Sequence, residues 1–65
     1  MKRWEVVKGM QEGTFKNGDR FEVYYPNDES FYYTYIDSNG CLMWEVNDCP
    51  VHIASYSEDN WIKIN

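Results

Sequence analysis

The chain has 65 residues, a formal net charge of −5 and 43% hydrophobic residues, with three Trp, six Tyr and three Phe among them. A chain of this length predicts one domain over residues 1–65, which buries only about 60% of its unfolded surface. Eleven acidic against six basic residues argue against binding to nucleic acid or to an anionic membrane surface, because both need Lys and Arg.

The sequence also lacks the signals of export or membrane insertion. No stretch approaches the roughly 20 apolar residues of a membrane span, and the start MKRWEVV has no apolar segment of signal-peptide length. We therefore expect a cytoplasmic protein (in a host cell). There Cys41 and Cys49 are expected as free thiols that fill core space, with a disulfide as the alternative in an oxidising compartment.

The first expected element is a helix over residues 3–12. Gly13 follows it, where a helix C-terminal cap glycine belongs. A strand over residues 4–8 is the alternative, and Gly9 weakens both, since Gly costs a helix about 1 kcal/mol relative to Ala. Helical spacing brings four side chains onto one face: Arg3, Val6, Val7 and Met10.

Strand signals fill the middle of the chain. Asn17-Gly18 is a turn signal, and residues 21–25 then alternate as a strand does, up to Pro26. The clearest prediction is a hairpin with strands over 31–37 and 41–46, joined by the turn Ser38-Asn39-Gly40.

The last part of the chain gives weaker signals. Residues 51–54 read as a short strand, and Ser55 and Glu58 have the spacing of a capping box. A closing strand over 61–64 would carry Ile62 and Ile64 on one side.

These elements predict an α+β fold, with one short N-terminal helix packed on an antiparallel meander of about four strands. An all-β, small SH3-like barrel is the alternative if residues 4–8 form a strand. Homo-oligomerisation would be an additional source of stability for so small a scaffold.

Residues that could support enzyme chemistry are sparse. His52 is the only histidine, and it stands between Val51 and Ile53 with no nucleophile motif nearby, which favours a surface side chain. Cys41, Cys49 and His52 do not have the tight spacing of a zinc site. We therefore expect no catalytic residues, no metal and no cofactor.

The aromatic side chains are more numerous than a core of this size can enclose. If Phe31, Tyr33 and Tyr35 pack on the helix, the alternate side chains of that strand lie on the outer face. Such a patch marks a binding groove or a subunit interface, or it serves only to pair rings across the sheet. The predicted ligand or partner surface, with the nearby basic residues added, comprises Tyr24, Tyr32, Ile36, Met43, Lys16 and Arg20.

The order of motifs resembles a group of small phage and prophage proteins of unassigned function. The motifs are the opening WEVVKGMQEG, the following TFKNGDRF and the closing SEDNWIKI. The layout is also similar to that of phage Thoeris anti-defence proteins, which sequester cyclic ADP-ribose-type signalling nucleotides as oligomers. In the basic strand of that pattern this chain has only Lys16 and Arg20, and Ile62 follows the closing Trp where the pattern has an acidic residue.

Two hypotheses for function follow. The first is a non-catalytic phage accessory protein that holds a small nucleotide-like ligand, with rings stacked on the base and Lys8, Lys16 or Arg20 on the phosphate. The second is an acidic protein–protein interaction module that inhibits a host protein, whose binding would weaken with salt.

Overall fold

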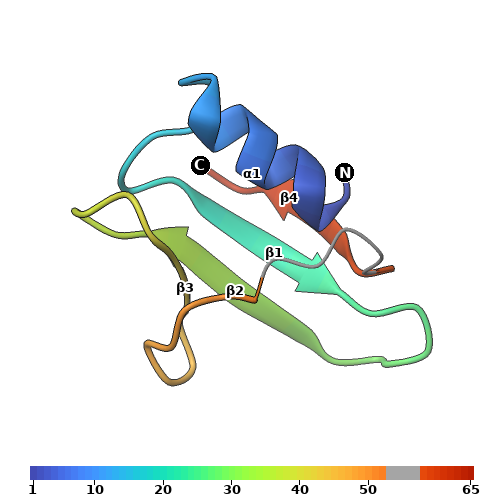
Figure 1. The fold of residues 1–65 in the computed structure, drawn as a ribbon. Coiled ribbons are helices and arrows are strands. Elements are labelled where there is room, and N and C mark those ends of the chain that lie inside the picture. Colours follow the sequence, from blue (N-terminus) through green and yellow to red (C-terminus); the bar gives the residue numbers. More distant parts are fainter. Residues whose placement is uncertain (53–57) are drawn as a thin grey trace.

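The computed structural model of the chain describes residues 1–52 and 58–65. It confirms the predicted α+β class, so the barrel alternative is wrong. The strand predicted over 51–54 and the capping box from Ser55 involve residues outside the described part of the chain. The helix and strands (Figure 1) are α1 (Arg3–Gln11), β1 (Arg20–Tyr24), β2 (Phe31–Ile36), β3 (Leu42–Trp44) and β4 (Asn60–Lys63).

Helix α1 begins at the predicted residue and ends at Gln11, one residue before the predicted end. At its start the side chain of Glu5 accepts a hydrogen bond from the Lys2 backbone N–H at 2.8 Å, which satisfies one of the free donors of the first turn. At its end Gly13 takes a φ of +81° and its N–H donates to the Met10 carbonyl. That left-handed conformation suits Gly because it has no Cβ.

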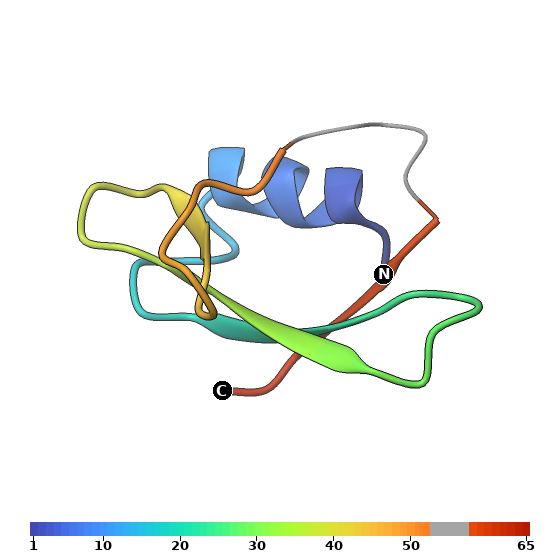
Figure 2. The same ribbon diagram turned by 90° about the horizontal axis from the view of Figure 1, so that it is seen from below.

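The four strands form one antiparallel sheet in the order β3-β2-β1-β4. The first three strands form a meander, but β4 pairs with β1 and not with β3, so the order departs from a simple meander. After β3 the chain leaves the sheet on the side of the helix (Figure 2). Trp61 of β4 then lies beside Phe21 of β1, with ring centroids 5.9 Å apart.

The helix covers one face of the sheet (Figure 2), and the core lies between them. Gly9 is buried with the inward side of the helix, together with Arg3 and Val6. The buried hydrophobic side chains are Val6, Phe21, Val23, Ile36, Leu42, Val51 and Trp61.

In the part of the chain that the structure describes, no helix has the length and apolar character needed to cross a membrane.

The predicted faces of strand β2 are reversed in the structure. Phe21 pairs with Thr34 in the antiparallel register, and Thr34 is completely buried under the helix. Because side chains alternate along a strand, Tyr32 and Ile36 also face the helix, whereas Phe31, Tyr33 and Tyr35 lie on the outer face. The side chains of β2 alternate between the two faces of the sheet as predicted. Because both faces carry rings, this alternation does not indicate which face the helix covers.

The two cysteines and the single histidine all lie at the surface of the protein. Cys41 and Cys49 are free thiols, as expected, but both are exposed, so the expectation that they fill the core is wrong. Strand β3 begins only at Leu42, which leaves Cys41 in the turn. His52 is exposed as predicted.

Candidate functional site: an aromatic pocket at one end of the sheet

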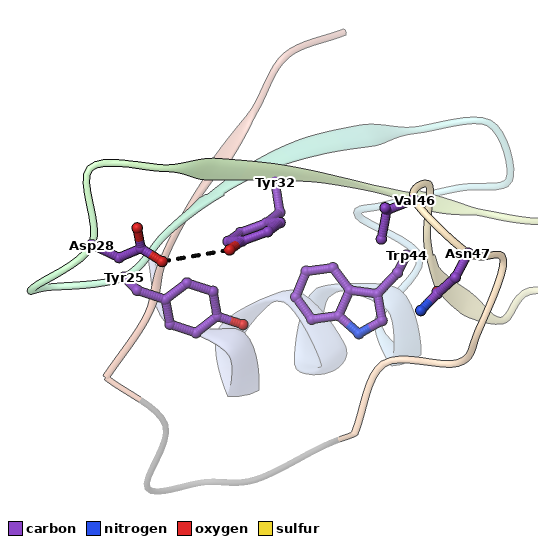
Figure 3. Close-up of a pocket in the computed structure, with 6 residues that line it drawn as sticks. All are labelled: Tyr25, Asp28, Tyr32, Trp44, Val46 and Asn47. Atoms are coloured by element: carbon purple, nitrogen blue, oxygen red, sulfur yellow. Dashed lines mark hydrogen bonds between the residues drawn. The ribbon is translucent and has the colours of Figure 1, made fainter.

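A pocket of about 440 Å³ opens on the helix side of the sheet, beyond the ends of β1 and β3. Its volume falls in the range typical of small-molecule sites, roughly 300–1,000 Å³. Figure 3 shows the rings of Tyr25 and Trp44 on either side of a gap, with Tyr32 above them. The residues that line it are Tyr25, Asp28, Tyr32, Trp44, Val46 and Asn47.

The three rings of the pocket form a continuous edge-to-face series. The centroids of Tyr25 and Tyr32 lie 5.7 Å apart with planes at 76°, and those of Tyr32 and Trp44 lie 6.2 Å apart at 80°. This geometry is the preferred one for aromatic pairs. The rings therefore hold one another in place along the pocket.

The connection between β1 and β2 forms one wall. Pro26 follows Tyr25, and the Asp28 N–H donates to the Tyr25 carbonyl at 3.2 Å, which closes a turn. The Asp28 carboxylate accepts hydrogen bonds from the Ser30 N–H at 2.9 Å and from the Tyr32 hydroxyl at 3.4 Å. The short polar loop thus fixes a carboxylate beside the rings (Figure 3).

The turn after β3 forms the opposite wall. The Asp48 N–H donates to the Trp44 carbonyl at 2.8 Å, and the Asn47 side chain accepts from the Cys49 N–H at 3.0 Å. This turn holds Val46 at the rim, where 77% of its surface is exposed. An apolar side chain so open to water is available to cover a ligand.

An ion pair lies next to the pocket, between the helix and the sheet. The Arg3 guanidinium is 3.1 Å from the Asp59 carboxylate, and both side chains are buried. Asp59 also accepts a hydrogen bond from the Trp61 indole N–H. The guanidinium stacks over Trp44 and Trp61, 5.9 and 5.8 Å from the ring centroids.

The phenol of Tyr25 remains protonated at neutral pH. Burial is the main cause that raises its pKa above the ordinary value of 10.0, and the nearby positive charge of Arg3 opposes this rise. Tyr25 therefore offers a neutral hydroxyl and a π face, and it is not a base at neutral pH.

Of the six predicted surface residues, only Tyr32 lines this pocket. Ile36 is buried in the core, because β2 faces the other way from the prediction. The outer sheet face carries Tyr24, Met43 and Arg20, opposite to the pocket.

The basic residues that the sequence suggested for a phosphate lie away from the pocket rings. Arg20 is paired with Glu45 at 2.7 Å and stacks on Tyr33, 5.4 Å from its centroid. Lys16 is exposed in the turn before β1, and Lys8 lines a separate hollow beside Trp4. None of the six described lining residues is basic.

Five of the pocket residues were not predicted from the sequence. Tyr25 and Tyr32 stand at the two ends of one short connection, and Pro26 marks where β1 stops. That arrangement is a sequence signal for neighbouring rings. Trp44 reaches Tyr32 through the β2–β3 hairpin that the sequence predicts. Val46 and Asn47 join the pocket through the turn after β3, although the predicted strand continues to residue 46.

Comparisons of the chain with models of protein families, with curated proteins and with solved structures find no match.

Proposed function

We propose that this is a non-catalytic binding protein that sequesters a small organic ligand in the aromatic pocket. The observation that carries the proposal is the convergence of Tyr25, Tyr32 and Trp44 on one pocket of about 440 Å³. Pockets that are mostly apolar, with a few fixed polar groups, are the usual form of a ligand site. Asp28, Asn47 and the two phenol hydroxyls supply those polar groups here.

Flat rings suit this pocket because stacking on an aromatic side chain contributes about 1–3 kcal/mol per nucleic-acid base. Sequestration is also what the resemblance to phage anti-defence proteins implies. The basic residues expected on a phosphate lie elsewhere on the molecule, so the pocket supports binding of the ring part of a ligand.

The test is a titration of the ¹⁵N-labelled protein with adenosine, which has a flat base and no charge. We expect chemical-shift changes at the backbone amides of Tyr25, Tyr32 and Asn47 and at the indole N–H of Trp44. Trp44→Leu should weaken binding by about tenfold or more, since it removes one stacking surface.

The matched control is Trp4→Leu, because Trp4 is an exposed Trp on the helix and lies outside the pocket. This variant should bind adenosine as the unmodified protein does. Shifts confined to the outer face around Arg20 and Tyr33, or equal losses in both variants, would contradict the proposal.

A further inference from the structure

This inference rests on the proposed function of the pocket as a ligand-binding site. The charges of the residues that line the pocket then indicate which class of ligand it binds. Three electron-rich rings and one carboxylate, that of Asp28, line it, and no Lys or Arg is among the described lining residues. The face of an aromatic ring carries partial negative charge and attracts a cation within about 6 Å of its centroid. An anionic ligand would be repelled by Asp28, and the nearest cation, Arg3, is already paired with Asp59.

The adjoining ion pair shows that this cluster of rings already accommodates one positive charge. The Arg3 guanidinium lies over Trp44 and Trp61 at cation–π distance. Its charge is balanced by Asp59 at 3.1 Å. The cation next to the pocket therefore has its own counter-ion and leaves Asp28 available.

Asp28 itself has no basic partner among the residues that the structure describes. The hydrogen bonds that it accepts come from a backbone N–H and a phenol hydroxyl, which are neutral donors. Asp28 is exposed and lies at the Tyr32 side of the pocket. A carboxylate that lines an aromatic pocket and is not balanced by a Lys or Arg is complementary to a positively charged ligand. The net charge of −5 would favour the approach of such a ligand from a distance.

We infer that the pocket binds an organic cation of the alkylammonium class. The ammonium group would lie against the faces of Tyr25, Tyr32 and Trp44, with Asp28 as its counter-ion, and Val46 would cover its methyl groups. Rings together with a carboxylate are the general chemistry by which proteins recognise quaternary ammonium groups.

The test compares choline with 3,3-dimethylbutan-1-ol, which has the same shape but no charge. Both are titrated into the unmodified ¹⁵N-labelled protein, and the shifts of the Trp44 indole N–H and the Tyr32 amide give the affinities. We expect choline to bind at least about fivefold more tightly, since a cation adds the ring and carboxylate attraction. Higher salt should reduce that difference.

Asp28→Asn removes the charge but keeps an oxygen that can accept from the Ser30 N–H, so the loop should keep its shape. This variant should lose several-fold in choline affinity and bind the neutral alcohol as before. The matched control is Glu12→Gln, the same loss of one negative charge at the exposed end of the helix, which should leave both affinities unchanged.

Equal binding of choline and the alcohol would overturn this inference. Adenosine binding at the pocket would then still uphold the proposed function. If choline, the alcohol and adenosine all fail to shift the pocket resonances, both the inference and the proposed function are wrong.

Discussion

Asp59 has 1% of its surface exposed, although it is a charged side chain in a small domain. In the core its carboxylate accepts hydrogen bonds from the Arg3 guanidinium and from the Trp61 indole N–H. Arg3 also donates to the His52 carbonyl. Arg3, in the first turn of the helix, is thus bonded to Asp59, the residue before β4, and to His52. One buried ion pair therefore connects residues near the two ends of the chain.

Asp59→Asn should therefore be strongly destabilising, because it leaves the Arg3 charge buried without a counter-ion. Removing one partner of a buried pair costs about 3–5 kcal/mol, against a total stability of roughly 3–10 kcal/mol for a chain of this size. Urea unfolding followed by circular dichroism measures the loss. Glu45→Gln, in the exposed pair with Arg20, is the control and should change the midpoint little. Equal effects of the two variants would show that burial does not set the cost.

At the scale of the elements, Gly9 explains how the helix lies so close to the segment that follows it. The ring of Phe15 packs directly on the backbone at Gly9, where a Cβ would come closer than 3.0 Å to two ring carbons. Phe15 cannot move freely, because its ring lies edge-on to Phe21 at 5.2 Å. The residue that weakens the helix as a local structure is therefore needed for its packing.

Gly9→Ala should destabilise the protein, contrary to the expectation from helix propensity. Ala would add about 1 kcal/mol of intrinsic helix stability, but a clash in a packed site costs about 1–3 kcal/mol. Lys8→Ala, on the exposed side of the same helix, should be close to neutral. Thermal unfolding compares the two variants. A higher melting temperature for Gly9→Ala than for the unmodified protein would contradict the packing argument.

At the scale of the whole molecule, partly buried or bonded tyrosines lie on both faces of the sheet. Burial raises the pKa of Tyr25. On the outer face, hydrogen bonds to Glu22 and Asp48 raise the pKa of Tyr24 and of Tyr35. The outer face also leaves half of the Phe31 surface exposed. The large number of rings is thus divided between a core, a pocket and an open sheet face.

The raised pKa of these phenols predicts a loss of stability at alkaline pH. Above 10.0, the ordinary value, the phenols ionise in the unfolded chain before they ionise in the folded one. This ionisation lowers the free energy of the unfolded state relative to that of the folded state. The free energy of unfolding should fall as pH rises from 10.0 through the folded pKa. Urea unfolding at a series of pH values measures this slope. Tyr25→Phe should make the slope shallower, and an unchanged slope would contradict the assignment for Tyr25.

Local sequence signals are sufficient to predict the helix and the central hairpin. The 3.6-residue spacing and Gly13 determined the helix, which the sequence places over 3–12 and the structure over 3–11. The turn at Asn39-Gly40 determined the hairpin, since Gly40 takes a φ of +80°. These features depend on backbone preferences and neighbouring residues, which a sequence states directly.

Three features follow from tertiary packing instead: which face of the sheet is covered, where β4 pairs and where the pocket forms. Strand alternation assigns neighbouring side chains to opposite faces but does not say which face meets the helix when both carry rings. That choice depends on the register of β1 against β2, in which Phe21 pairs with the buried Thr34. The pairing of β3 with β2 then places Trp44 beside Tyr32. The pocket brings together residues of separate segments, so its existence depends on long-range packing that no local pattern encodes.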